Sequence, residues 1–144
     1  AFVCNISEED VPEDIIAPES VDLITCIFVL SAIPPEKLSA TVQRLKKLLK
    51  PGGMILFRDY GNFDLTHMRF FAKKKTAKVA DNFYRRSDGT FTFFFSTEYC
   101  EQLFTENGFE IVENRYECRI VNNRKRKIKM YRVWMQGKFQ KPLN

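Results

Sequence analysis

A long apolar segment followed by an amphipathic one constrains the fold of this chain more than any other feature. Residues 21–30, VDLITCIFVL, are almost continuously apolar and rich in β-branched side chains. A strand with one solvated face would alternate apolar and polar residues, so this composition is typical of a parallel strand covered on both faces. The segment therefore predicts a central strand of a sheet.

The next segment predicts a helix that leads into a second strand. In residues 34–50 the apolar side chains recur at helical spacing, with Lys and Arg between them: Leu38, Val42, Leu45 and Leu49. The prolines suit the first turn, and Lys-Pro-Gly-Gly at 50–53 ends the helix because proline cannot continue it. Residues 54–57, MILF, then indicate a strand. Strand, helix, glycine turn and strand make half of a doubly wound α/β sheet.

The middle of the chain predicts smaller elements. We expect a short helix over residues 65–71 and a tight turn at Asp88-Gly89 that joins two extended pieces. The second piece, TFTFFF at 90–95, is strand-like, and its phenylalanines are expected in the core. Residues 96–108 begin with a capping Ser or Thr and end with Asn-Gly, as helices often do.

The last section predicts an antiparallel hairpin. Residues 109–139 alternate well enough for two long strands joined near Asn122-Asn123. Trp134 lies on the second of these strands, where we expect a core position in preference to a platform for a base.

Two expected parts of a nucleotide-binding sheet are missing from the sequence. The first residues, AFVCN, indicate the end of a strand, and no glycine-rich turn between a strand and a helix follows it. Gly52-Gly53 comes after a helix and therefore lacks the required context. We expect residues 1–144 to be the carboxyl-terminal part of a larger nucleotide-binding domain, without its first strands and glycine-rich loop, and inactive by itself.

Composition excludes several classes of protein. The 144 residues suit one globular domain, and no run approaches the ~18 apolar residues of a membrane span. Four scattered cysteines do not indicate a disulfide framework or a zinc site, and a metal is not expected. The single histidine, His67, is expected to be structural or solvated. We expect a cytoplasmic protein, with the nucleus and the mitochondrion left open.

The positive charge is unevenly distributed. The formal net charge is +5, and basic residues crowd the sequence after Arg115, with a second group around Lys73–Lys75 and Arg85-Arg86. A basic surface suits a phosphate-bearing partner. A charged hairpin that only improves solubility is an equal alternative on charge alone.

Polar residues follow directly after the predicted strand at 54–57. They are Arg58, Asp59 and Tyr60. Ligands bind beyond the carboxyl ends of parallel strands in open α/β sheets, so these three side chains are candidates for a functional site. The structural alternative is an ordinary ion pair between Arg58 and Asp59 at a strand end.

Five strings spread over nearly the whole chain carry a family resemblance. They are IFVLSAI at 27–33, LLKPGGMILFRDYG at 48–61, MRF at 68–70, NFYRRSDGT at 82–90 and MYRVWMQGKFQKP at 130–142. Together they resemble the tRNA 3-methylcytidine methyltransferases of the methyltransferase-like group. The resemblance implies an α/β fold: the carboxyl-terminal portion of a class I, Rossmann-like methyltransferase sheet, mostly parallel with a terminal antiparallel hairpin.

The resemblance also implies an activity and a cofactor. Enzymes of this family transfer a methyl group from S-adenosyl-L-methionine to N3 of a cytidine in the tRNA anticodon loop. Asn5 and Ile6 would then lie by the adenine of the cofactor, and Ile27 and Phe28 would form its wall. The family usually has an aspartate where Asn5 stands, and an amide oxygen can accept the same hydrogen bond. The implied partner is tRNA, with an aminoacyl-tRNA synthetase as a candidate helper in its selection.

The resemblance gives roles to the strand-end residues. Cytosine gains positive charge as the methyl group arrives, so a nearby carboxylate would favour the product side, and Asp59 is the candidate. Arg58 would hold a phosphate or fix Asp59, and Tyr60 would offer a stacking face for a base.

A second set of residues is predicted to bind RNA. It combines arginines, aromatic rings and amides with the basic tail: Arg69, Asn82, Phe83, Tyr84, Arg85, Asp88, Arg124, Lys125, Arg126 and Lys127. A hairpin with aromatic core residues is the structural alternative for the segment 82–88. Two other functions stay open: a non-catalytic domain that binds RNA or a partner, and methyl transfer to a protein or small molecule.

Overall fold

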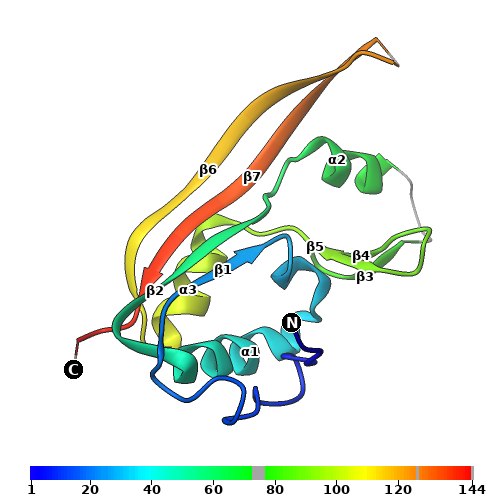
Figure 1. Cartoon of the computed structure of the whole chain (residues 1–144). Helices are drawn as coiled ribbons and strands as arrows, with labels where there is room; N and C mark the ends of the chain where they lie inside the picture. The colour runs from blue at the N-terminus through cyan, green and yellow to red at the C-terminus, as the bar shows by residue number, and fades with distance from the viewer. Residues whose placement is uncertain (73–76, 126, 144) are drawn as a thin grey trace.

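A four-stranded mixed sheet forms the body of the chain in the computed structural model (Figure 1). The structure describes residues 1–72, 77–125 and 127–143. The strand order is β1-β2-β7-β6, and a smaller sheet has the order β3-β4-β5. Within the larger sheet β1 and β2 are parallel, whereas β2 and β7, and β7 and β6, are antiparallel.

The predicted strand–helix–strand unit is confirmed. It consists of β1 (Val21–Ile27), α1 (Pro35–Leu48) and β2 (Leu49–Tyr60). Pro34 precedes α1, and the helix buries the apolar stripe that its spacing predicts, including Leu38, Val42 and Leu45. Burial of that stripe against the sheet fixes α1, because an isolated helix of 14 residues would be marginal in water.

The second strand is longer than the sequence predicts. β2 begins at Leu49 and therefore includes the Pro-Gly-Gly segment, in which Gly52 has a φ of +78°. At the other end it includes Arg58, Asp59 and Tyr60, each of which is paired with a residue of β7. These three side chains therefore alternate between the two faces of the sheet.

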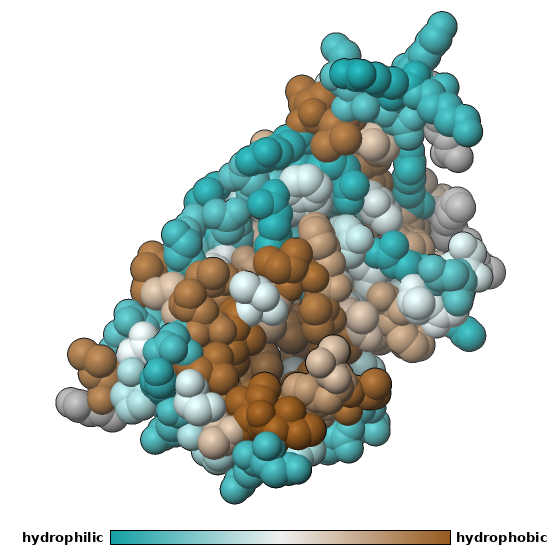
Figure 2. Space-filling model, viewed as in Figure 1, coloured by the Kyte–Doolittle hydropathy of each residue, from teal (hydrophilic) through white to brown (hydrophobic). Residues whose placement is uncertain are grey.

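The expected central position of residues 21–30 is wrong for the described part of the chain. β1 lies at the edge of the sheet, and Leu23 and Ile27 are 59% and 48% exposed. Its other face is covered, since Cys26 is buried. Apolar side chains gather over β1 in Figure 2, on the face toward the viewer. The continuous apolar composition of β1 thus indicates that both of its faces are suited to burial, and in the described residues one of them is covered.

The expected strand at residues 1–5 is also absent. These residues have no regular structure, and residues 6–9 form a turn. A strand needs a hydrogen-bonded neighbour, and no described residue supplies one here. The segment instead lies along α1, where Arg44 donates to the carbonyl oxygens of Ile6 and Ser7.

One face of the sheet is covered by α1 and by α3 (Thr97–Glu106). Ser96 caps α3, as expected, by accepting a hydrogen bond from the backbone N–H of Tyr99. Phe104 of α3 stacks on Phe139 with ring centroids 3.6 Å apart, and both lie near Phe57 of β2. The core therefore lies between these helices and what we term the covered face of the sheet; the opposite face is the open face.

The predicted terminal hairpin is confirmed. It consists of β6 (Glu110–Asn123) and β7 (Ile128–Gln140), and its turn follows Asn123. The hairpin extends well beyond the other strands, and its tip lies far from both termini (Figure 1).

A small aromatic subdomain lies beside the carboxyl end of β2. It contains α2 (Leu65–Ala72), β3 (Lys78–Ala80), β4 (Phe83–Arg85) and β5 (Phe91–Phe93). The predicted helix and the turn at Asp88-Gly89 are confirmed, and Gly89 has a φ of +88°. Phe93, Phe94 and Phe95 are buried, as expected. β3 was not anticipated, because the lysine-rich sequence before it gives no strand pattern.

Candidate functional site

Asp59 is fully buried and holds the loop that follows β1. Its side chain points to the covered face, where Oδ2 accepts the backbone N–H of Ser31 at 2.9 Å. Oδ1 accepts the backbone N–H of Tyr60, also at 2.9 Å. Ser31 belongs to the short 3-10 turn η1 (Leu30–Ala32), which directly follows the end of β1. Asp59 therefore fixes the position of this loop through its backbone.

The ionisation of Asp59 reflects two opposing effects. Burial raises the pKa of its carboxyl group above the usual range, because the charged form is poorly solvated. The hydrogen bonds from Ser31 and Tyr60 oppose that rise, because they stabilise the charged form. The predicted contact between Asp59 and a cytosine ring stays a prediction; the geometry shows a carboxylate whose two oxygens are engaged by the backbone.

Arg58 lies on the face opposite to Asp59. The two residues are adjacent in a strand, so their side chains diverge, and neither the predicted ion pair nor a fixing contact between them forms. The Arg58 guanidinium carbon lies 4.5 Å from the centroid of the Trp134 ring. Its hydrogen-bond partner is Gln136 Oε1, at a long 3.5 Å. No carboxylate of the described residues pairs with Arg58.

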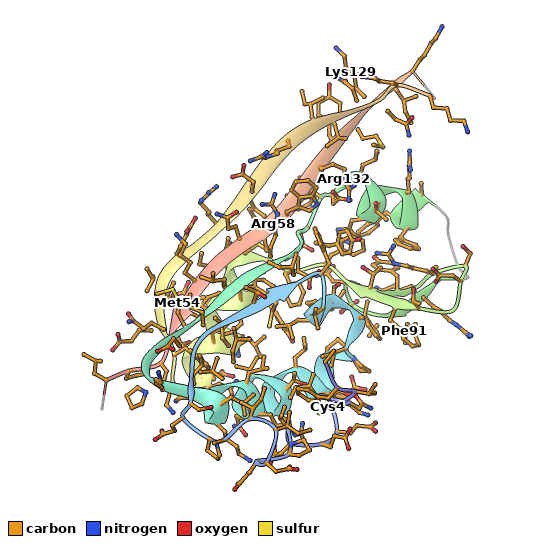
Figure 3. The ribbon with its side chains drawn as sticks, in the orientation of Figure 1. Cys4, Met54, Arg58, Phe91, Lys129 and Arg132 are labelled. Atoms are coloured by element: carbon orange, nitrogen blue, oxygen red, sulfur yellow. The ribbon has the colours of Figure 1, made fainter. Side chains whose placement is uncertain are left out.

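Trp134 belongs to the open face, which corrects the expected core position. It is half-buried and opposite Tyr60 in the pairing of β2 with β7. The Trp134 and Phe28 rings are nearly perpendicular, with centroids 6.2 Å apart, and the Arg132 guanidinium lies 5.6 Å from the Trp134 ring centroid. Arg58 and Arg132 follow one another along the sheet toward the hairpin tip (Figure 3).

Three arginines and three aromatic rings gather here. Tyr60 lies 4.9 Å from Phe28 between ring centroids, and the Arg86 guanidinium lies 5.1 Å from the Tyr60 ring. We term this set the arginine–aromatic cluster: Phe28, Arg58, Tyr60, Arg86, Arg132 and Trp134. Of its arginines, Arg132 alone has a hydrogen-bonded carboxylate partner among the described residues, namely Asp64.

Phe28 has an unusual backbone conformation at the end of β1. Its φ is +54°, and its side chain is 39% exposed. A bulky residue in the left-handed region costs about 1–3 kcal/mol and persists only where its surroundings enforce it. The enforcing contacts are the bond from its N–H to the carbonyl of Arg58, at 2.8 Å, and the Asp59–Ser31 bond. Such strain often marks a functional site.

The predicted cofactor residues do not all converge. Ile27 and Phe28 are exposed apolar side chains at the carboxyl end of β1, which suits the wall of a ligand site. Ile6 packs against the core. The Asn5 side chain is occupied locally, because its Oδ1 accepts from Ser7 and its Nδ2 donates to Glu8.

A cavity, which we term the arginine pocket, opens between α2 and the β4–β5 hairpin. Its volume is about 450 Å³, and it is lined by Thr66, Arg69, Phe70, Ala77, Arg85, Arg86, Ser87 and Asp88. The predicted residues Arg69, Arg85 and Asp88 thus share one cavity. Asp88 also shapes the turn, because its Oδ1 accepts from Thr90 N–H and Oγ1. Arg86 links this pocket to Tyr60 of the arginine–aromatic cluster.

Other residues of the segment 82–88 are structural. Phe83 and Tyr84 are buried, and Phe83 stacks on Phe91, so neither ring offers a face to a base. Tyr84 stacks on Phe70, and its hydroxyl lies 3.4 Å from His67 Nε2. Asn82 has a φ of +56° and joins β4 to the preceding turn.

His67 is structural, as one of the two expectations states. It is buried in the aromatic subdomain, where it stacks on Phe94 with centroids 4.3 Å apart. Its Nδ1 accepts the backbone N–H of Phe63. Burial lowers the pKa of His67, while Asp64 opposes this effect.

Asp64 is an anchoring residue that the sequence analysis misses. Its Oδ1 accepts the N–H of Thr66 in the first turn of α2, and its Oδ2 accepts from Arg132 Nε and from the N–H of Val133. An aspartate before a helical segment is a recognisable capping signal. Its bonds to β7, which lies nearly seventy positions later, have no sequence signal.

The basic hairpin tip is exposed and distant from the strand-end cluster. Arg124, Lys125 and Lys127 are exposed there, and Arg126 lies outside the described residues. Lys129 marks the same end of the hairpin in Figure 3.

Three further findings concern the parts of the chain outside the strand-end cluster. A cavity of about 740 Å³ lies between the ends of α1 and α3, near the start of β1 and thus away from the strand-end cluster. No group of three or more His, Cys, Asp or Glu side chains could hold a metal ion in the described residues. None of the helices in residues 1–72, 77–125 and 127–143 combines the length and apolar character that crossing a bilayer requires.

The described fold corresponds to half of an α/β nucleotide-binding domain. It has a parallel β1–α1–β2 unit, a terminal antiparallel hairpin, and a candidate ligand site at the carboxyl ends of β1 and β2. The profile of the family described as "Methyltransferase domain" matches residues 3–114. The chain therefore belongs to the methyltransferase-domain family.

Curated relatives are similar over the whole chain. The chain is 48% identical to O-methyltransferase 3 of Dictyostelium discoideum over 144 residues, which are 100% of this chain and 33% of that protein. It is 45% identical to the tRNA N(3)-cytidine methyltransferase METTL2 of Gallus gallus, over 99% of this chain and 37% of that protein. It is 43% identical to the human tRNA N(3)-cytidine methyltransferase METTL6, over 98% and 48%. The predicted resemblance is confirmed, and the chain spans a third to a half of these relatives.

Solved structures confirm the predicted α/β methyltransferase fold. A SAM-dependent methyltransferase from Methanosarcina mazei matches 99% of this chain and 67% of its own, with a TM-score of 0.72 and 19% identity. A 1,6-didemethyltoxoflavin N1-methyltransferase from Burkholderia thailandensis, solved with bound 1,6-didemethyltoxoflavin and S-adenosylhomocysteine, matches 98% of this chain and 50% of its own, with a TM-score of 0.62 and 14% identity.

Proposed function

We propose that this chain is the substrate-facing part of an enzyme that transfers a methyl group from S-adenosylmethionine to N3 of a cytidine in the anticodon loop of tRNA. The observation that carries the proposal is the arginine–aromatic cluster at the carboxyl ends of β1 and β2, in a chain 43–45% identical to tRNA N(3)-cytidine methyltransferases. Stacking rings beside guanidinium groups suit an unpaired nucleotide.

The carboxylates near the site favour a nitrogen nucleophile over a hydroxyl. Cytosine N3 already has a lone pair, so methylation there needs positioning more than a base. A hydroxyl acceptor would need a base to remove its proton. Asp59 and Asp64 are fully buried and hydrogen-bonded, and Glu117, opposite Trp134, is paired with Arg115 and Arg119, so none of the three is free for that task. This supports N-methylation, although one relative is named an O-methyltransferase.

The residues at the end of β1 fit one side of a cofactor. S-adenosylmethionine would supply an electrophilic methyl group, and Ile27 and Phe28 would hold it by apolar contact. Asp59 would keep Phe28 in place through the N–H of Ser31. Asn5 makes local bonds only and gives no support to an adenine contact.

The free edge of β1 supports a partial domain. The backbone groups on that edge are unpaired in the described residues, and Leu23 and Ile27 on the open face are exposed. An edge of this kind is open to pairing with a further strand. We propose that the cofactor-binding strands of the whole enzyme pair there, so that the chain alone binds RNA without transferring a methyl group.

Nucleoside analysis tests the proposed reaction. The protein that contains this chain is incubated with S-adenosylmethionine and tRNA, and N3-methylcytidine is measured by mass spectrometry of the digested tRNA. We expect the modified nucleoside to accumulate in the anticodon loop. An Asp59→Ala variant, which removes the acceptor of the Ser31 N–H, should bind the cofactor more weakly and transfer methyl groups more slowly, because Phe28 is then held less firmly. Methylation of an oxygen, or of no position in tRNA, would contradict the proposal.

The hairpin tip supplies a separate test. Arg124→Ser, Lys125→Ser and Lys127→Ser together should weaken binding of an anticodon stem-loop RNA and lower the slope of log affinity against log salt by about 2, at ~0.7 per lost single-strand phosphate contact. Lys47→Ser with Lys50→Ser is the matched control, because these lysines already pair with Asp10 and Asp22. An unchanged slope in the tip variant would make its charges irrelevant to RNA.

A further inference from the structure

Arg58 is held on the open face by a ring instead of a carboxylate. Two other arginines on this face are neutralised: Arg115 pairs with both Glu113 and Glu117, and Arg132 pairs with Asp64. Arg58 instead contacts the indole of Trp134, at 4.5 Å from the ring centroid. A cation–π contact fixes the direction of a guanidinium without cancelling its charge.

The register of the sheet explains why this arrangement is specific. Arg58, Gln136 and Arg115 lie in one row across β2, β7 and β6. The Gln136 amide bridges two strands, since its Oε1 accepts from Arg58 and its Nε2 donates to Glu113 Oε1. Glu113 is already engaged by Arg115 and Lys138, so it does not reach Arg58. In this row Arg58 lies between Gln136 and the apolar Ile27 of β1, so its positive charge is not neutralised.

The indole N–H of Trp134 lacks a hydrogen-bond acceptor among the described residues. Its Nε1 atom is nevertheless buried. The ring lies near both Arg58 and Arg132, and it is nearly perpendicular to the ring of Phe28, the strained residue at the end of β1. The indole contributes neither to the main core nor to a hydrogen bond among the described residues, and the shortest of its ring contacts is the one with Arg58, at 4.5 Å.

We propose that Trp134 is a positioning residue that holds Arg58 ready to bind a phosphate of the target nucleotide, while the Tyr60 ring beside it receives the unpaired base. This inference rests on the proposed function and adds a residue to it. A guanidinium forms a planar fork that matches two phosphate oxygens, and a preset direction lowers the entropy lost on binding. The ligand is therefore an unpaired nucleotide within single-stranded RNA.

Salt-dependent RNA binding tests the proposal in the 144-residue chain. The probe is a fluorescein-labelled anticodon stem-loop RNA, and its affinity is measured by anisotropy over a series of salt concentrations. Arg58→Gln should weaken binding at low salt about tenfold and lower the salt slope by ~0.7. Trp134→Leu should lower the slope equally, and the double variant should lose no more than either single one. Trp134→Phe keeps a ring and should retain most of the slope.

Two matched controls separate this role from general damage. Arg115→Gln removes an arginine from the same row, but one that two glutamates already neutralise, so the slope should not change. Tyr131→Leu removes an exposed ring from the opposite face of β7 and should also have no effect. Circular dichroism of every variant should match the wild type.

The outcomes distinguish this inference from the proposed function. The chain contains one tryptophan, so quenching of its emission by single-stranded oligocytidylate, and not by tripolyphosphate, should report a base arriving near Trp134. If RNA binds but Trp134→Leu keeps the wild-type slope, or if the losses from Arg58→Gln and Trp134→Leu add, the inference is wrong and the proposed function stands. If the wild-type chain binds no RNA at any salt concentration, its proposed RNA-binding role falls, and the inference with it.

Discussion

The two faces of the four-stranded sheet carry different kinds of side chain, although both belong to the same strands. On the covered face, Ile55, Phe57 and Phe139 are buried against α1 and α3. On the open face, Leu56, Arg58 and Tyr60 alternate with them and remain partly exposed. The covered face holds the fold together, and the open face presents charge and aromatic surface to a ligand.

The carboxylates of the two faces show the same contrast. Asp59, on the covered face, has a raised pKa because it is buried. Glu113, on the open face, has its pKa lowered to about 2 by hydrogen bonds from Lys138 and Arg115. Burial penalises a charge that an ion pair in water would favour, so the two groups should respond to pH in opposite directions.

The largest expected effect is on the covered face. Phe57→Ala removes a ring that contacts Phe95, Phe104 and Phe139, with centroids 5.2, 5.9 and 6.1 Å away. The free energy of unfolding should fall by about 3–5 kcal/mol, measured by urea denaturation followed by circular dichroism. A loss under about 1 kcal/mol would show that this face is not the core that the burial indicates.

Asp59→Ala should have an intermediate effect. It leaves the buried N–H of Ser31 without its acceptor, which costs about 1–3 kcal/mol. Because the folded pKa is raised, the contribution of Asp59 is fully present below its ordinary pKa and declines as pH rises through the raised value. The stability difference between wild type and variant should therefore be larger near pH 4 than near pH 7. A difference that grows with pH would contradict the assigned cause.

Glu113→Gln should have a smaller destabilising effect, with the opposite pH dependence. Its ion pairs with Arg115 and Lys138 are partly exposed, so the loss at neutral pH should be at most about 1 kcal/mol. The folded pKa of about 2 lies below the ordinary Glu value, so the contribution is present above that value and disappears as pH falls toward 2. Urea titrations at pH 7 and pH 3 measure both differences.

Leu23→Ala on the open face should have the smallest effect. The side chain is 59% exposed, so truncation should change the free energy of unfolding of this chain by no more than about 0.5 kcal/mol. The same change in the protein that contains this chain should cost more if a further strand and its cover pack there. Equal small effects in both would count against pairing at the β1 edge.

Local patterns predicted most of the elements of this fold. The helical spacing in residues 34–50, the cap at Ser96 and the turn at Asp88-Gly89 all depend on interactions within a few residues, and the structure confirms each of them. The hairpin of β6 and β7 follows from alternation and a short connection. The position directly after the strand pattern at 54–57 singled out Arg58, Asp59 and Tyr60, although it did not fix the directions of their side chains.

The sequence by itself determined the order of the longer elements, because spacing, capping and turn chemistry act over short distances, and its motifs determined the methyltransferase class. Tertiary structure alone decided which face of the sheet each side chain occupies and which strands lie side by side. It turned Asp59 into the covered face and Arg58 onto Trp134, placed β1 at an edge, and joined Asp64 to β7. Alternate side chains of a strand point to opposite faces, and either set could face the core. Packing of α1 and α3 on one side of the sheet determines which set is buried.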